Sequence, residues 1–97
     1  MYQIIWSESA KKDYWQNIDY LLENWSETVA KNFMEEVERY LFVIRKNPKT
    51  FLQTEYQNVH AVPVVSQITL FYRITDNKFI ELIRFWNNYQ DPSKLRL

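Results

Sequence analysis

The spacing of hydrophobic residues changes twice along the chain and divides it into helical and extended parts. The short aromatic and β-branched run Tyr2–Trp6 predicts a buried strand. Beyond it, apolar residues recur every three or four positions, which predicts an amphipathic helix with Ser7 or Ser9 as its N-cap. The apolar stripe of this helix consists of Ala10, Tyr14, Ile18, Leu21, Leu22 and Trp25.

A second amphipathic helix follows almost without a linker. Ser26 is its predicted N-cap, and Asn47-Pro48 ends it after the basic residues Arg45 and Lys46. Because so few residues join the two helices, we expect them to fold back as an antiparallel hairpin. The apolar stripe of the second helix consists of Val29, Phe33, Val37, Tyr40, Leu41 and Ile44.

After a polar stretch the hydrophobic period becomes two, which is typical of strands. Val59–Val65 is β-branched but contains Pro63, which has no N–H for a sheet hydrogen bond and so indicates an edge or a bulge. Ser66–Thr75 alternates cleanly between apolar and polar residues. Asp76-Asn77 predicts a hairpin turn, and Phe79–Trp86 predicts the returning strand.

This order of elements predicts an α+β fold for a single domain that spans residues 1–97. The expected architecture is β-α-α-β-β-β, with the helical hairpin packed on one face of a mainly antiparallel sheet.

The composition excludes several classes of functional site. The 97 residues include no Cys and no Gly, so the chain has no thiolate metal site and no glycine-rich phosphate loop. The single histidine, His60, excludes the usual His-rich zinc or di-iron site, and no metal or cofactor is expected. The N-terminus resembles no signal peptide and no apolar run approaches membrane-spanning length, which predicts a cytoplasmic protein without membrane contact.

Charge is balanced along the whole sequence. The chain has 12 basic and 12 acidic residues, so its formal net charge is zero. A protein that binds nucleic acid through phosphate neutralisation alone normally has a clear positive excess. The balance therefore weighs against a general DNA or RNA binder, although a small local patch remains compatible with it.

Three segments carry a resemblance to a known family: the strand Leu70–Ile74 with its Phe-Tyr-Arg core, the strand Phe79–Ile83, and the tail Phe85–Leu95. With these segments the sequence resembles, over nearly the whole chain, the RelE/ParE superfamily, the toxins of type II toxin–antitoxin systems. The opening strand, followed by Ser-Glu-Ser-Ala and a helix with Tyr, Trp and Ile in its stripe, is also similar. The resemblance implies a toxin that a cognate antitoxin neutralises.

Ribosome-dependent members of this superfamily cut mRNA with basic and aromatic side chains on the exposed sheet face and the tail. At the position of the central strand that is often Arg, this chain has Thr69, and at the tail position that is usually Arg it has Tyr89. The preceding strand, which often carries Lys or Arg, offers His60 instead. These departures favour a toxin that binds its target, as ParE-like members bind DNA gyrase, over one that cleaves mRNA.

Four residues are the candidates for catalysis, and each has a structural alternative. His60 has the one side chain whose ordinary pKa lies near neutrality, but a strand His is commonly only half exposed and bonded to water. Arg73 is suited to holding a phosphate, or to pairing with Glu81 across the hairpin, and Arg84 has the same ambiguity. Tyr89 is suited to stacking on a base or donating a proton, or to covering the core edge.

Five residues are the candidates for antitoxin binding. The second helix is more apolar than one narrow stripe can bury, which indicates that some of its hydrophobic side chains meet a partner. Trp15 lies off the main stripe of the first helix and is the expected aromatic anchor. The remaining candidates are Phe33, Met34, Val37 and Leu41.

The function of the chain stays open between two classes at this stage. The first is a toxin, acting either as a ribosome-dependent endoribonuclease or as an inhibitor of DNA gyrase. The second is a non-toxic, catalytically degenerate interaction module that keeps the same fold. A homodimer and a toxin–antitoxin hetero-oligomer are both compatible with the sequence.

Overall fold

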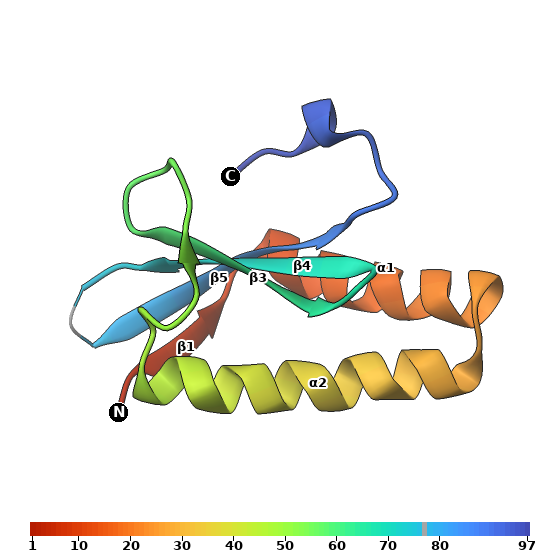
Figure 1. Cartoon of the computed structure of the whole chain (residues 1–97), viewed down its shortest axis with the longest axis horizontal. Helices are drawn as coiled ribbons and strands as arrows, with labels where there is room; N and C mark the ends of the chain where they lie inside the picture. Colours follow the sequence, from red (N-terminus) through yellow and green to blue (C-terminus); the bar gives the residue numbers. More distant parts are fainter. Residues whose placement is uncertain (77) are drawn as a thin grey trace.

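The computed structural model describes residues 1–76 and 78–97 and places two antiparallel helices against one face of a five-stranded sheet (Figure 1). Asn77, in the predicted hairpin turn, lies outside the described residues. The predicted α+β architecture, with a helical hairpin on one face of a mainly antiparallel sheet, is confirmed. The elements are β1 (Gln3–Trp6), α1 (Glu8–Asn24), α2 (Glu27–Lys46), β2 (Leu52–Gln53), β3 (Val59–Val65), β4 (Ile68–Ile74), β5 (Phe79–Asn87) and the 3₁₀ turn η1 (Pro92–Lys94).

The sheet has the strand order β1-β5-β4-β3-β2. The pairings among β2, β3, β4 and β5 are antiparallel, whereas β1 runs parallel to β5 and lies at the edge. The sequence did not predict β2, a two-residue strand that pairs with His60 and Ala61 of β3. Both β2 residues are exposed, so the hydrophobic alternation that identifies a strand is missing there.

Both predicted helix starts are confirmed by capping hydrogen bonds. The Ser7 hydroxyl accepts a hydrogen bond from Ala10 N–H at 2.9 Å, and the Ser26 hydroxyl accepts one from Val29 N–H at 3.1 Å. Each serine satisfies one of the free N–H groups at a helix start. Trp25, which the helical stripe assigned to the core, is instead the C-cap residue of α1 and is half exposed.

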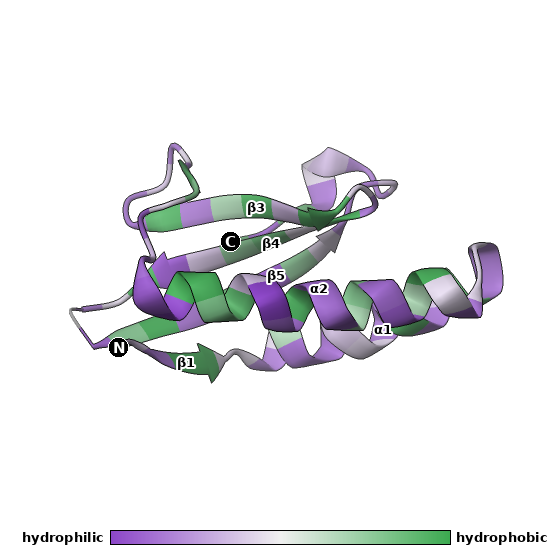
Figure 2. Cartoon of the chain, turned by 60° about the horizontal axis from the view of Figure 1, so that its bottom comes forward, coloured by the Kyte–Doolittle hydropathy of each residue, from purple (hydrophilic) through white to green (hydrophobic). Residues whose placement is uncertain are grey.

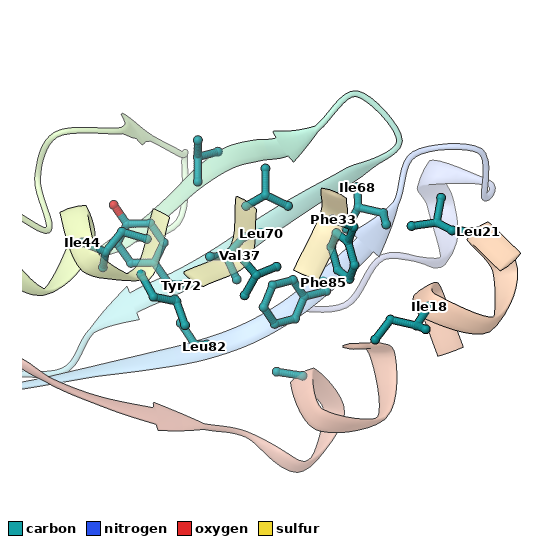
Figure 3. Packing of buried hydrophobic residues seen from close by; sticks show 14 of the residues in the cluster. Ile18, Leu21, Phe33, Val37, Ile44, Ile68, Leu70, Tyr72, Leu82 and Phe85 are labelled. Atoms are coloured by element: carbon teal, nitrogen blue, oxygen red, sulfur yellow. The ribbon is translucent and has the colours of Figure 1, made fainter. Parts of the chain in front are cut away.

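The core fills the space between the helical hairpin and the sheet. Along α2 the ribbon alternates between hydrophilic and hydrophobic segments, as an amphipathic helix does (Figure 2). Side chains from α1 and α2 meet those of β4 and β5 in one cluster (Figure 3). The largest fully buried side chains include Tyr72, Phe33, Phe85, Leu21 and Leu41.

Pro63 lies where the sheet tolerates it. Because β2 pairs only with His60 and Ala61, no strand of the described residues lies outside β3 at Pro63. The pairing of β3 with β4 also shifts register between Pro63 and Val65. The predicted edge position and the predicted bulge are therefore both confirmed.

The two faces of the sheet differ in what covers them. α1 and α2 cover one face, while the chain after β5 turns to the opposite side and ends there (Figure 1). On that side a groove of about 410 Å³ lies between the loop after β2 and the C-terminal residues, with Phe71 of β4 at its base. No helix within residues 1–76 and 78–97 has the length and apolar character needed to span a membrane.

Candidate functional site

On the side of β5 away from β4, the part beyond Leu82 has no neighbouring strand among the described residues, because β1 ends at Trp6. Ser7 continues the contact for one residue: its N–H donates to Leu82 O at 3.1 Å and its hydroxyl to Ile83 O at 3.0 Å. Further along β5, side chains of α1 form the hydrogen bonds that a neighbouring strand would otherwise form. A buried backbone group without a partner costs free energy comparable to a lost hydrogen bond, so this edge needs such partners.

Asp13 and Asn17 supply those partners at Phe85. The Asp13 carboxylate accepts a hydrogen bond from Phe85 N–H at 3.1 Å, and the Asn17 amide donates to Phe85 O at 2.8 Å. The two residues are one helical turn apart, so their side chains lie on the same face of α1. Both are buried. Sequence reasoning missed this pair, although two polar residues that interrupt an apolar helical stripe are a signal that could have revealed it.

Arg84 is held by the same carboxylate. Its Nε and Nη2 atoms lie 2.6 Å and 3.0 Å from the two oxygens of Asp13, a bidentate arrangement. The hydrogen bonds to Asp13 raise the pKa of Arg84 above its ordinary value, against the opposing effect of burial. The guanidinium also lies over the ring of Trp86, 5.5 Å from its centre. Arg84 therefore fastens β5 to α1, and its charge is already neutralised.

Arg73 forms the cross-strand ion pair that the sequence offered as its alternative role. It lies directly opposite Glu81 in the register of β4 and β5, and its Nη1 is 3.3 Å from the Glu81 carboxylate. Both side chains are more than one-third exposed. Because Arg73 pairs with Val59 on its other side, while Tyr72 points into the core, Arg73 lies on the face away from the helices.

His60 lies on the opposite face and is only 4% exposed. It is the register partner of Tyr72, and the two rings are nearly parallel at 5.4 Å. Burial lowers the pKa of His60, the backbone of Asn58 opposes this effect, and the charge of Lys49 adds to it. Its Nδ1 atom is buried without a hydrogen-bond partner. The sequence interpretation of a half-exposed, water-bonded His is therefore corrected: this His packs against the core.

Tyr89 is exposed (64%) and stacks on the α1 side of the molecule. Its ring centre lies 6.5 Å from that of Tyr20 and 6.4 Å from that of Trp25. Its N–H donates to the Asn87 side chain at 2.9 Å. Tyr89 and Arg84 line the same pocket of about 220 Å³, together with polar side chains of α1.

The structure does not assemble the four candidate catalytic residues into one site. His60 packs on the helical side of the sheet, and Arg73 lies on the other side. Arg84 is bound to α1 at the sheet edge, and Tyr89 stacks beyond it. Thr69, at the position where the superfamily often has Arg, donates a hydrogen bond to the side chain of Asn88 at 2.9 Å.

The candidates for antitoxin binding divide into exposed and buried residues. Trp15 is 62% exposed and Met34 is 39% exposed, so both are available to a partner. Phe33, Val37 and Leu41 are buried in the core, where they face α1 and the sheet. The prediction that these three residues bind the antitoxin is corrected, because their side chains are buried inside the toxin itself.

A groove of about 280 Å³ lies beside Trp15 and contains Trp6, Tyr14, Lys11 and Glu38. Tyr14 and Trp15 pack edge to face, with ring centres 5.3 Å apart. Burial and the nearby Glu38 carboxylate raise the pKa of the Tyr14 hydroxyl. Met34 lies one helical turn before Glu38 and therefore on the same face of α2. The groove thus has aromatic walls and one charge of each sign at its rim.

Comparison with known proteins identifies the family. Residues 4–92 match the family described as the ParE toxin of the type II toxin–antitoxin system parDE. No curated protein matches the chain. Solved structures with the same fold include the following three.

The chromosomal ParDE system of P. aeruginosa gives a TM-score of 0.72 at 14% identity, over 90% of this chain and 96% of that one. The YoeB dimer of Staphylococcus aureus gives 0.63 at 18% identity, over 91% and 98%. The E. coli DinJ–YafQ toxin–antitoxin complex gives 0.58 at 15% identity, over 89% and 91%. At these identities the likeness is one of fold, whereas the family match covers nearly the whole sequence. The chain belongs to the ParE family of toxins of type II toxin–antitoxin systems.

Proposed function

We propose that this toxin inhibits growth by binding DNA gyrase in the cytoplasm and does not cleave mRNA. The observation that carries the proposal is that the four candidate catalytic side chains do not form one site. Arg84 and Tyr89 share a pocket, but the charge of Arg84 is paired with Asp13. His60 and Arg73 lie on opposite faces of the sheet. The ParE family match supports gyrase as the target, because ParE-like members of the superfamily act on this enzyme.

RNA cleavage makes demands that these residues do not meet. A 2′-hydroxyl must lose a proton, cations must offset the charge that develops on the phosphate, and the leaving oxygen must gain a proton. Arg73 and Arg84 already have the carboxylates of Glu81 and Asp13 as partners. His60 is packed against Tyr72 on the helical side of the sheet. A binding toxin needs none of these groups to be free.

We also propose that the antitoxin neutralises the toxin by docking on the groove beside Trp15. The exposed Trp15 and Met34 offer apolar surface on both helices, and an amphipathic helix or extended segment buries such surface on binding. Lys11 and Glu38 at the rim provide charges that fix the orientation of the bound segment.

The test of the target combines growth with two biochemical assays. The chain is induced alone in a bacterial host, and the purified protein is added to a gyrase supercoiling assay and to a translation reaction analysed by primer extension. We expect arrested growth, inhibited supercoiling and no new mRNA ends. The variants Arg73→Ala and Tyr89→Phe are expected to inhibit supercoiling as the wild type does.

Two outcomes contradict the proposal. Discrete mRNA cuts that disappear in Arg73→Ala would establish an endoribonuclease. Normal growth at high soluble expression, with supercoiling unaffected, would leave the non-toxic interaction module as the function. Each outcome excludes the gyrase mechanism in a different assay, so the alternatives are separated.

A further inference from the structure

A polar pocket lies at the end of the molecule where α2 stops and β3 begins. The N-terminus, the end of α2 and the end of β4 lie together at this end (Figure 1). The volume of the pocket is about 600 Å³, which falls within the ~300–1,000 Å³ range of small-molecule sites. It shares no lining residue with the groove beside Trp15 or with the pocket of Arg84 and Tyr89. It is therefore a separate candidate site, which we call the His60 pocket.

His60 is the buried polar side chain of this pocket. It lines the pocket and is only 4% exposed, and its Nδ1 atom has no hydrogen-bond partner among the described residues. Buried polar atoms of side chains normally have such a partner. The hydroxyl of the neighbouring Tyr72 already donates to Pro48 O at 2.6 Å, so it is not available to the imidazole. A polar group that enters the pocket can supply the hydrogen bond that the protein itself does not.

Two opposite charges line the same pocket without pairing. Lys49 and Asp76 are both exposed, and neither forms an ion pair with any residue that the structure describes. Burial lowers the pKa of His60 and the charge of Lys49 adds to this effect, so the ammonium group acts directly on the imidazole. The exposed rim of the pocket thus has one unpaired positive and one unpaired negative charge above a buried imidazole.

Hydrogen bonds to the backbone hold the walls of the pocket in place. The Asp76 carboxylate accepts hydrogen bonds from Lys78 N–H at 2.8 Å and Phe79 N–H at 3.2 Å. Both bonds use Oδ1, so Oδ2 has no partner among the described residues and remains an acceptor. The Gln53 amide donates to three backbone carbonyls of the loop after β2, at 2.9–3.1 Å. A ligand therefore meets ordered walls, which reduces the entropy lost on binding.

We propose that the His60 pocket binds a free α-amino acid in its zwitterionic form. The carboxylate of the ligand pairs with the Lys49 ammonium, and its own ammonium group pairs with the Asp76 carboxylate. Both contacts are charge-assisted hydrogen bonds, which are about twice as strong as those between neutral groups. The side chain of the ligand extends over His60 and offers the imidazole a polar partner.

Charge complementarity favours a zwitterion over a simple ion. An anion would be attracted by Lys49 but repelled by Asp76, and for a cation the two effects are reversed. A zwitterion is the small ligand that satisfies both charges at once. The remaining polar lining residues, Gln53, Asn58 and Thr75, are uncharged, which favours a ligand with a polar, uncharged side chain such as glutamine.

The first experiment uses the single histidine of the chain as a reporter of its own pocket. L-glutamine is titrated into ¹³C-labelled toxin, and the Cε1–H signal of His60 is followed by NMR. Two analogues each lack one charge of the zwitterion: glutaminamide has no carboxylate, and N-acetylglutamine has no ammonium group. We expect a saturable shift with glutamine and about tenfold weaker binding of each analogue. No saturable shift with glutamine, or equal binding of either analogue, overturns the proposal.

The second experiment assigns each ligand charge to its partner. Lys49→Gln is expected to bind glutamine about tenfold more weakly and to lose the discrimination against glutaminamide, because the partner of the carboxylate is gone. Asp76→Asn keeps an oxygen that accepts the same backbone N–H bonds but loses the charge, so it no longer discriminates against N-acetylglutamine. Lys12→Gln, at an exposed position of α1, is the control and keeps the affinities of the wild type. Unchanged discrimination in both pocket variants overturns the proposed contacts, and circular dichroism checks that all three variants fold.

Neither experiment requires gyrase or the antitoxin, so this inference stands or fails separately from the proposed function. If glutamine shifts the His60 signal while supercoiling is unaffected, the pocket is confirmed and the gyrase mechanism is wrong. If supercoiling is inhibited and the His60 signal does not respond to glutamine, the opposite holds. Binding of N-acetylglutamine as tight as that of glutamine would identify a site for the carboxylate of a peptide end, and the assignment to a free amino acid would be wrong.

Discussion

The Asp13 carboxylate binds the side chain of Arg84 and also the backbone N–H of Phe85, the next residue of β5. It accepts two hydrogen bonds from the guanidinium and one from Phe85 N–H. Because β1 is too short to cover this part of β5, Asp13 and Asn17 satisfy backbone groups that a longer β1 would otherwise pair. The contact links the two ends of the sequence, 71 residues apart.

Removing this carboxylate is expected to destabilise the protein strongly. Asp13→Ala leaves a mostly buried guanidinium and a backbone N–H without partners, at a cost of about 3 kcal/mol in the free energy of unfolding. The double variant Asp13→Ala/Arg84→Ala recovers part of the loss, because the unpaired charge is then absent. Urea unfolding of the four proteins in the cycle measures the coupling.

Lys11→Ala, which breaks an exposed ion pair with Glu8, serves as the control and shifts the free energy of unfolding by about 0.5 kcal/mol or less. Strictly additive losses in the cycle would contradict this role of Asp13.

The ion pair between Arg73 and Glu81 is expected to contribute little to stability. Both side chains are more than one-third exposed, so solvent screens their attraction, and Arg73→Ala costs about 0.5 kcal/mol in the free energy of unfolding. The same variant keeps the growth inhibition of the wild type, since a binding toxin does not use this cation for catalysis. Growth curves after induction, with matched expression levels, provide the measurement. Loss of toxicity in a fully folded Arg73→Ala protein would restore a functional role for this residue.

The sequence predicted the elements better than the contacts between distant residues. Helix and strand periods, the serine caps and the edge position of Pro63 depend on neighbours within a few residues, so a pattern can reveal them. Whether Arg73 is free or paired with Glu81 depends on the register between β4 and β5. The hydrophobic pattern does not fix this register, and a shift of one residue would move Arg73 to the other face. The structure settles it by placing Glu81 directly opposite.

The candidate sites were harder to predict for a specific reason. The apolar face of α2 is wider than one narrow stripe, which predicted that Phe33, Val37 and Leu41 would bind a partner. In the structure α1 and the sheet together bury most of this face. The role of Asp13 was not predicted, because no local pattern shows that one side of β5 has no strand beside Phe85. Both errors concern which surface a helix meets, and that depends on the whole topology.

His60 is expected to make stability depend on pH. Burial lowers its pKa in the folded state, so between that value and about 6.5 the unfolded chain binds more protons than the folded one. The free energy of unfolding therefore rises as the pH increases through this window and levels off above it. Below the pKa of His60 in the folded state, His60 is protonated in both states, so its destabilising effect on the free energy of unfolding no longer changes with pH. His60→Phe keeps a ring against Tyr72 and removes the titration, so its free energy of unfolding changes less between pH 5 and about pH 7.5 than that of the wild type. Urea titrations of both proteins across this range measure the difference, and parallel pH profiles would exclude His60 as the cause.

Trp15 and Phe33 are expected to separate partner binding from folding. Trp15 is 62% exposed, so Trp15→Ala changes the free energy of unfolding by about 0.5 kcal/mol or less, yet removes the anchor of the proposed antitoxin groove. Phe33 packs against Tyr14 and Phe85 in the core, and Phe33→Ala costs about 3–5 kcal/mol in the free energy of unfolding through the cavity it leaves.

Urea unfolding and the affinity for the co-expressed antitoxin are measured on the same preparations. We expect Trp15→Ala to weaken the complex more than tenfold with normal stability, whereas Phe33→Leu, which restores much of the volume, keeps near-normal affinity. If Trp15→Ala binds the antitoxin as tightly as the wild type does, the groove beside Trp15 is not the neutralisation surface.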